Sequence, residues 1–327
     1  MASKQVFDRK LQELEQLLGA PQSTETVAAL RKALRDKSNL IVAKAARLVQ
    51  EFDLRDLIPD LLAAFSRFFE DLPKSDPQCW GKNAIAQALK DFGYTEPDPF
   101  LKGIGHVQRE PVWGGQEDTA GKLRGICVLA LLECRSLSDH TLLSHLTDLL
   151  ADSDAGVRAD TARAMAHTGR MEAALLLRLK IACGDAKPEV TGACLSALLA
   201  MDPRTGVQSA QRLLAGDGED LRYEAAAALG ASREEAAIDL LRSTYATTRD
   251  PQFRLALLRA IGASLHPAGL TYLVGLINPA DSATARWAIE ALAPAKYREE
   301  MRTKVEAAVR ATESEALLSA YRRHFES

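Results

Sequence analysis

The stretch DAGVRADTARAM (residues 154–165) decides the fold of this chain, because variants of it recur along the sequence. Each variant begins with a usually apolar residue, often followed by Arg, and ends in Ala-Leu or a similar pair. The first residues of five such segments lie 33, 31, 32 and 31 positions apart: Val157, Val190, Leu221, Phe253 and Thr284. A fixed period of this size indicates a solenoid, in which each unit buries its apolar face only against its neighbours.

Each repeat is predicted to form two antiparallel helices joined by a tight turn. Asp154 is suited to cap the first helix, Gly169 to end it, and the second helix is expected from Met171 to Ala182. Asp250-Pro251 opens a later unit in the same way, because proline is tolerated at the first helical position. The expected fold class is all-α: a right-handed α-solenoid of about eight or nine antiparallel helix pairs.

The repeat register predicts one solenoid over residues 1–327, of uneven regularity. Residues 118–293 hold regular repeats of 31–34 residues, and residues 294–327 are expected to form C-terminal capping helices. Residues 1–117 are degenerate, with insertions expected at about 66–78 and 92–116. Insertions in solenoids lie on one face, commonly the binding face.

The repeated units resemble HEAT repeats, specifically the short bacterial kind found in the phycobilisome-lyase HEAT-like family. The resemblance rests on the Asp-x-x-apolar-Arg…Ala-x-Ala-Leu pattern over residues 118–293. It implies a structural ladder, in which each Arg bridges to acidic groups of the adjacent turn. The ladder position is held by Arg124, Arg158, Arg222 and Arg254, whereas Thr191 and Ala285 interrupt it.

Charge and composition argue against several classes of protein. The chain has 41 basic and 44 acidic residues, a formal net charge of −3 and no basic stripe, so nucleic-acid binding is not expected. No apolar signal segment or membrane-spanning run is present, which predicts a soluble, cytoplasmic protein that does not bind membranes. Cys127, Cys134, Cys183 and Cys194 lie in apolar helical stretches and are expected to fill the core.

Motifs for catalysis are lacking in the sequence. It contains no Gly-rich phosphate loop, no H-E-x-x-H and no G-x-S-x-G, and none of its six histidines is followed by Glu. We therefore expect no catalytic residues, no metal and no cofactor, although enzymatic activity stays open.

One candidate binding region departs from the repeat pattern; we call residues 79–82 and 105–124 the insertion patch. It combines aromatic, charged and amide side chains with Gly114-Gly115, and Trp and Arg are enriched in binding hot spots. The helix starts of successive repeats lie along one edge of the solenoid. The two segments are therefore expected to meet there in a patch with a net positive charge. The candidate binding residues are Trp80, Lys82, His106, Gln108, Arg109, Glu110, Trp113 and Arg124. Alternatively, Trp113 covers a hydrophobic gap between poorly stacked units, before a helix that starts at Gln116.

The leading functional hypothesis is a non-catalytic, monomeric scaffold that binds a protein or peptide through its concave face and the insertion patch. The second helix of each pair is expected to line that concave face, with mixed polar residues such as Arg178, Gln208 and Asp239. The resemblance leaves a second hypothesis, a lyase-like or chaperone-like protein that handles a tetrapyrrole. A third, a HEAT-like nucleic-acid-binding protein, is disfavoured by the charge.

Overall fold

The computed structural model describes residues 2–71, 73–278 and 281–326. Met1, Leu72, Pro279, Ala280 and Ser327 lie outside the described residues, so one position of the insertion expected at 66–78 is not covered. The chain divides into two compact units, residues 1–167 and 168–327, which are described separately. In the described part of the chain, no helix is both long and apolar enough to span a bilayer.

Unit 1 holds nine helices and a two-stranded hairpin within its described residues. They are α1 (Ala2–Gln16), α2 (Thr24–Leu34), α3 (Asn39–Glu51), α4 (Ile58–Arg67), α5 (Trp80–Asp91), α6 (Asp98–Ile104), β1 (Arg109–Val112), β2 (Gly115–Asp118), α7 (Gly121–Ala130), α8 (Asp139–Leu149) and α9 (Ala155–His167). Short 3-10 turns at Arg55–Leu57, Pro77–Cys79 and Leu131–Glu133 connect some of them.

Unit 2 continues the alternation with ten helices in its described part. They are α10 (Met171–Cys183), α11 (Pro188–Met201), α12 (Pro203–Ala215), α13 (Glu219–Ser232), α14 (Glu235–Thr247), α15 (Pro251–Ala263), α16 (Pro267–Gly275), α17 (Ser282–Leu292), α18 (Glu299–Arg310) and α19 (Glu315–Phe325). The all-α solenoid expected from the repeat is confirmed, and the repeated motif lies on α9, α11, α13, α15 and α17.

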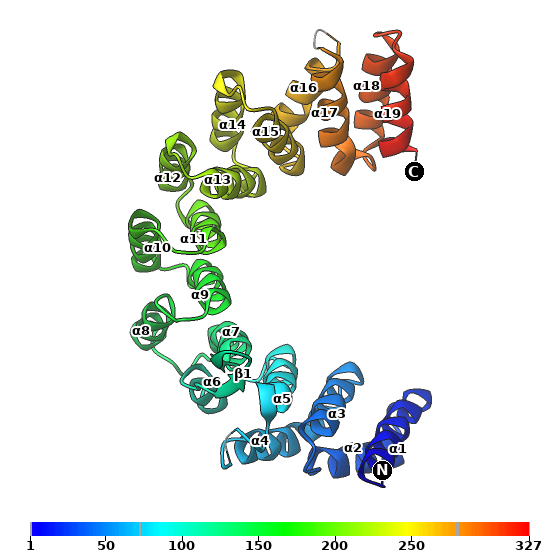
Figure 1. The fold of residues 1–327 in the computed structure, drawn as a ribbon, viewed down its shortest axis with the longest axis vertical. Helices are drawn as coiled ribbons and strands as arrows, with labels where there is room; N and C mark the ends of the chain where they lie inside the picture. The colour runs from blue at the N-terminus through cyan, green and yellow to red at the C-terminus, as the bar shows by residue number, and fades with distance from the viewer. Residues whose placement is uncertain (1, 72, 279–280, 327) are drawn as a thin grey trace. The chain divides into compact units, whose positions relative to one another are not determined.

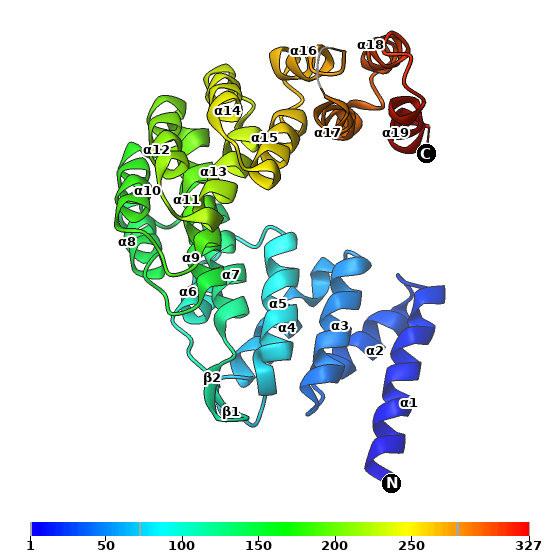
Figure 2. The same ribbon diagram turned by 45° about the horizontal axis from the view of Figure 1, so that its top comes forward.

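Each unit has two layers of helices, and the motif-bearing helices stack directly on one another (Figures 1 and 2). In unit 1, α3, α5, α7 and α9 form this layer; in unit 2, α11, α13, α15, α17 and α19 form it. Within unit 2, these helices lie on the inner, concave side of the unit's own curve, and α10, α12, α14, α16 and α18 lie on its outer side. The expectation that the second helices α10, α12 and α14 line the concave face is therefore wrong, because the motif-bearing helices occupy that side of unit 2.

The predicted helix starts are confirmed by their hydrogen bonds. Asp154 Oδ1 accepts from the Val157 amide at 2.9 Å, and Asp250 Oδ1 accepts from the Gln252 amide at 2.9 Å. Each carboxylate satisfies a backbone donor that the helix itself leaves unpaired. The aspartates that recur before the motif are therefore structural capping residues.

Glycines let neighbouring helices of the inner layer approach closely. A Cβ on Gly230 of α13 would lie 2.5 Å from the carbonyl oxygen of Ala260 on α15. A Cβ on Gly262 of α15 would likewise clash with the carbonyl oxygen of Ala291 on α17. The low aromatic content of the chain follows from this packing, since bulky side chains would push these backbones apart.

The insertion expected at 92–116 is only partly irregular. It contains α6, which packs on α7 as the outer helix of its pair, followed by the β1–β2 hairpin. Gly115 and Gln116 belong to β2, and α7 begins at Gly121. The expectation that a helix starts at Gln116 is therefore wrong, because Gly114, with φ of 95°, turns the chain back into a second strand.

The ladder arginines keep a structural role, but only part of the expected acidic pairing occurs. Arg124 pairs with Asp152 of the adjacent turn at 2.7 Å, as expected. The Arg222 guanidinium instead lies over the Phe253 ring at 4.1 Å, and that of Arg254 lies over the Tyr245 ring at 4.1 Å. Aromatic side chains take the place of the acidic partners for these two arginines, Phe253 from the following motif-bearing helix α15 and Tyr245 from the preceding helix α14.

The cysteines follow the core expectation with one exception. Cys127, Cys134 and Cys194 are buried, and burial raises the pKa of the Cys134 thiol to about 11. Cys183 is exposed, so the expectation that it fills the core is wrong. It is the last residue of α10, directly before Gly184, whose φ of 75° ends the helix.

Candidate functional site

The insertion patch is built around a hairpin that joins α6 to α7. Its strands pair antiparallel, with Glu110 opposite Glu117 and Val112 opposite Gly115. The tip, Trp113-Gly114, therefore projects from the hairpin, while its base connects directly to the helices. The outward position of the tip and the burial of the base divide the predicted binding residues into two groups.

A buried ion pair supports the base of the hairpin. Asp76 and Lys82 have fully buried side chains, and Lys82 Nζ lies 3.7 Å from Asp76 Oδ2. The Asp76 carboxylate also caps α5 by accepting from the Gly81 and Lys82 amides at 2.8 Å each. Burial lowers the pKa of Lys82, and the Asp76 carboxylate opposes that shift.

Gln108 links this ion pair to the hairpin. Its Oε1 accepts from Lys82 Nζ at 2.8 Å, and its Nε2 donates to the Asp76 carbonyl at 2.8 Å and to Glu110 Oε1 at 2.6 Å. His106 Nε2 lies 3.2 Å from the same Gln108 Oε1. Burial, with the nearby Lys82 charge, lowers the pKa of His106. These groups form one hydrogen-bonded network between the start of α5 and β1.

Glu110 holds a strained turn in place. Gln78 and Cys79 are both in the left-handed region, with φ of 56° and 54°, a conformation that is costly for residues other than glycine. Glu110 Oε1 accepts from the Gln78 amide at 2.6 Å and from Thr119 Oγ1 at 2.7 Å. Burial alone would raise the pKa of Glu110, but the hydrogen bonds from Gln108 and Thr119 lower it. An ionised Glu110 therefore ties the turn before α5 to both strands.

Arg124 fixes the other end of the hairpin. Its guanidinium donates to Asp118 Oδ2 at 2.7 Å, to the His106 carbonyl at 2.9 Å and to both Asp152 oxygens. Burial would lower the pKa of Arg124, but the hydrogen bonds and charges of Asp152 and Asp118 raise it. A buried cation between two carboxylates connects the hairpin to α7 and to the turn before α9.

The eight predicted binding residues thus fall into a buried and an accessible group. Lys82, His106, Gln108 and Arg124 are buried, and they are hydrogen-bonded within the protein. Lys82 and Arg124 therefore do not form the exposed positive patch expected from the sequence. Both side chains are buried, and their charges are compensated by Asp76, Asp118 and Asp152. A binding role for any of the eight stays a prediction.

The accessible group lies along the hairpin and at the start of α5. Trp113 is fully exposed, and 43% of Trp80 and 44% of Val112 are exposed. Arg109 is also exposed, on β1, and Glu110 is half-buried. The alternative in which Trp113 covers a hydrophobic gap is wrong, because this side chain buries no surface.

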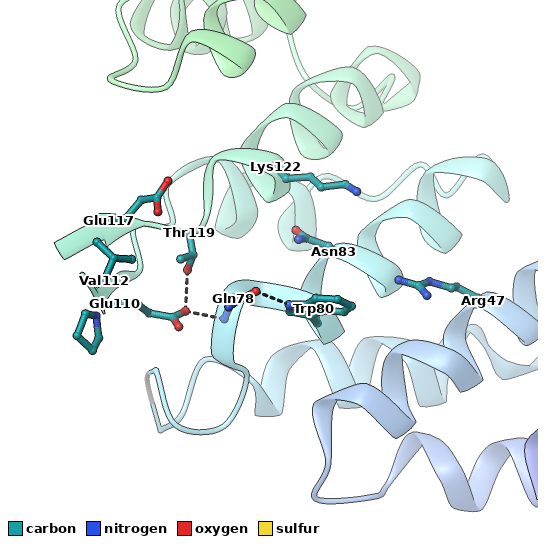
Figure 3. A pocket seen from close by; sticks show the side chains of 10 residues that line it. Arg47, Gln78, Trp80, Asn83, Glu110, Val112, Glu117, Thr119 and Lys122 are labelled. Carbon is teal, nitrogen blue, oxygen red and sulfur yellow. Dashed lines mark hydrogen bonds between the residues drawn. The ribbon is translucent and has the colours of Figure 1, made fainter. Parts of the chain in front are cut away.

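Beside the hairpin lies an open pocket of about 610 Å³, lined by residues of α3, α5 and α7 and by the hairpin. Trp80 and Asn83 come from α5, Arg47 from α3 and Lys122 from α7 (Figure 3). The Trp80 ring is steadied by a hydrogen bond from its Nε1 to Gln78 Oε1 at 2.9 Å. The hairpin closes the other side with Glu110, Val112 and Glu117 among its lining residues.

Asp76, Arg47 and Asn83 were not identified from the sequence as residues of the candidate site. Asp76-Pro77 has the same Asp-Pro signature as Asp250-Pro251 and marks the start of the 3-10 turn Pro77–Cys79, but it does not indicate that the carboxylate caps α5 beyond that turn. Arg47 and Asn83 carry no such signal, since they occupy ordinary helical positions whose shared pocket depends on how α3 and α5 stack.

The chemistry of the insertion patch favours a binding role over a catalytic one. Burial raises the pKa of the Cys79 thiol to about 11, so the nucleophilic thiolate is scarce at neutral pH. The buried Lys82 ammonium group donates a hydrogen bond to Gln108 and forms an ion pair with Asp76. Among the residues that the structure describes, no three His, Cys, Asp or Glu side chains gather as metal ligands would.

Comparisons with known proteins agree with the repeat pattern. A family model for HEAT repeats matches residues 175–262 and 208–293. No curated protein matches the sequence. Similar solved structures include the complex of CpcE and CpcF of phycocyanin lyase from Nostoc sp. PCC7120, at 17% identity over 77% of this chain and 94% of that chain, with a TM-score of 0.41.

Human deoxyhypusine hydroxylase is similar at 17% identity over 93% of this chain and 99% of that chain, with a TM-score of 0.25. An engineered protein is similar at 15% identity over 96% of this chain and 90% of that chain, with a TM-score of 0.36. Likenesses this loose say nothing about what the present chain binds or catalyses.

Proposed function

Because the chain carries HEAT repeats, we propose that it is a non-catalytic scaffold that binds a protein partner through the insertion patch. One observation carries the proposal: Trp113 is fully exposed at the tip of a hairpin whose base is held by buried polar groups. A large exposed aromatic side chain gains free energy when a partner covers it. A fixed base reduces the ordering entropy that binding must overcome.

The surroundings of the tip support a protein ligand. Val112 and Trp80 add exposed apolar surface, and Arg109 and Glu117 add exposed charges of both signs. Such a mixture of aromatic, apolar and oppositely charged groups is typical of protein interfaces. A nucleic-acid backbone fits less well, because Glu110 and Glu117 would repel its phosphates.

The inner layer of unit 2 offers a second surface for the same role. An open groove between α13 and α15 is lined by residues that include Tyr223, Gln252, Leu255 and Arg259. Neutral, apolar and charged side chains alternate there, and Arg259 is paired with Glu290. We include this groove in the proposed concave binding face.

The experiment that tests the proposal is affinity capture from a lysate of the source organism. It compares the wild type with the Trp80→Ala/Trp113→Ala variant. Tyr297→Ala is the matched control, because Tyr297 is an exposed aromatic residue of unit 2. We expect a protein that the wild type and the control retain and the double variant loses. Equal retention by all three folded proteins would remove the insertion patch from the proposal.

A further inference from the structure

Two of the cations that line the pocket beside the hairpin have no ion-pair partner among the described residues. Arg47 and Lys122 both line it, both are exposed, and neither forms an ion pair with any residue that the structure describes. Most other basic side chains around the hairpin base are neutralised: Lys82 by Asp76, and Arg124 by Asp118 and Asp152. The two unpaired cations come from helices on either side of α5.

A third polar group lies between them. The side-chain amide of Asn83 makes no hydrogen bond within the described chain, and its Oδ1 is inaccessible to solvent. The amide nitrogen is therefore the free donor that this side chain offers to the pocket. Figure 3 shows Asn83 between Lys122 and Arg47, with the Trp80 ring alongside. Three donors around one space suit a carboxylate, which has two oxygens to accept from them.

The opposite wall limits what else can bind. Glu110 and Glu117 line the hairpin side of the same pocket, so the pocket is positive toward α3 and α7 and negative toward the hairpin. A polyanion that fills the pocket would meet both glutamates. A single carboxylate on an otherwise neutral chain avoids them, and its apolar neighbours can cover Trp80 and Val112.

We infer that Arg47, Lys122 and Asn83 bind an isolated Asp or Glu side chain of the partner protein. This inference rests on the proposed scaffold function and adds the chemistry of the segment that is recognised. The carboxylate lies between the guanidinium and the ammonium group, and the amide nitrogen of Asn83 donates to it. The Trp80 ring packs on the segment that carries the acidic residue.

The test uses the pentapeptide acetyl-Ala-Ala-Glu-Ala-Ala-amide, with central Gln and central Lys peptides as comparisons. Binding is followed by NMR through the indole N–H signals of Trp80, Trp113 and Trp287, assigned with single Trp→Phe variants. We expect only the Glu peptide to shift the Trp80 signal in a saturable way. Equal binding of the Gln peptide would overturn the inference, as would a lack of binding by the Glu peptide.

Variants assign the effect to the two cations. Arg47→Gln/Lys122→Gln should weaken binding of the Glu peptide by about tenfold or more, since hydrogen bonds to charged groups are lost. Arg212→Gln/Lys187→Gln is the charge-matched control, because both residues are exposed in unit 2. Unchanged affinity of the first variant would overturn the inference, as would tighter binding of inorganic phosphate or of a single-stranded oligodeoxynucleotide.

The two proposals fail in different ways. If the wild type captures a protein that the Trp80→Ala/Trp113→Ala variant loses while the Glu peptide does not bind, the scaffold stands and the carboxylate site is overturned. If the Glu peptide binds at Trp80 while capture fails, the carboxylate site stands and the scaffold proposal is the one that fails.

Discussion

Removing the Asp76 carboxylate is the strongest test of the network beneath the hairpin. Its side chain is fully buried, caps two amides at the start of α5 and lies 3.7 Å from Lys82 Nζ. Asp76→Ala would leave a buried cation without its counter-charge, a change that costs about 3–5 kcal/mol in proteins. Loss of the helix cap contributes about 1 kcal/mol of the total.

The assay is a double-mutant cycle with Lys82→Met. The free energy of unfolding is measured by urea denaturation for the wild type, Asp76→Ala, Lys82→Met and the double variant. Native-state hydrogen exchange of the α5 amides reports unit 1 separately. Lys82→Met removes the buried charge that Asp76→Ala leaves without a partner. We therefore expect the free energy of unfolding of the double variant to exceed, by about 1 kcal/mol or more, the value obtained by adding the two single effects. Additive effects, or a cost of Asp76→Ala below about 1 kcal/mol, would refute the role of the ion pair.

Three further changes test other parts of the structure. Trp113→Ala should change the free energy of unfolding by no more than about 0.5 kcal/mol in urea denaturation, since the side chain is exposed. Gly262→Ala should destabilise by about 1–3 kcal/mol in the same assay because its Cβ meets the Ala291 carbonyl, whereas Gly275→Ala, with open space around it, should not destabilise. The pKa of His106 is lowered from its usual 6.5, so the unfolded chain takes up a proton first as the pH falls. Wild-type stability should therefore decrease below that pH, and His106→Asn should flatten the decrease between pH 7.5 and 5.5; an unchanged slope would contradict this.

The regular part of the fold could be predicted because each repeat contains local sequence signals for where its helices begin. Asp154 and Asp250 mark helix starts, and the spacing of Val157, Val190 and Leu221 marks successive turns of the solenoid. These signals act within a few residues, so they can be read locally. The layer that lines the inner side of unit 2 could not be read in this way, because curvature depends on how closely glycines such as Gly230 let helices approach.

For the candidate site, the sequence indicated where the repeat is interrupted but not which side chains would be buried there. Trp113, Gly114 and Gly115 marked a real interruption of the helical repeat, the hairpin at residues 109–118, whereas Arg124 belongs to the regular helix α7. The sequence did not indicate that Lys82 and Arg124 would be buried, because their partners Asp76 and Asp152 lie 6 and 28 residues away along the chain. Pairing at such separations depends on tertiary packing, which also brings Arg47 and Lys122 to one pocket.

The buried network has a consequence for the modularity of this protein. Two successive helices of the regular region, such as α12 and α13, make their main contacts with the neighbouring helices α11, α14 and α15, so protein engineers can expect to duplicate or delete a regular repeat as a unit. The segment from Asp76 to Asp152 cannot be exchanged in that way, because Gln108 and Arg124 bind it together across two repeats. A circular permutation or a loop graft would have to spare this segment, whereas the hairpin tip at Trp113 is open to replacement by other recognition sequences.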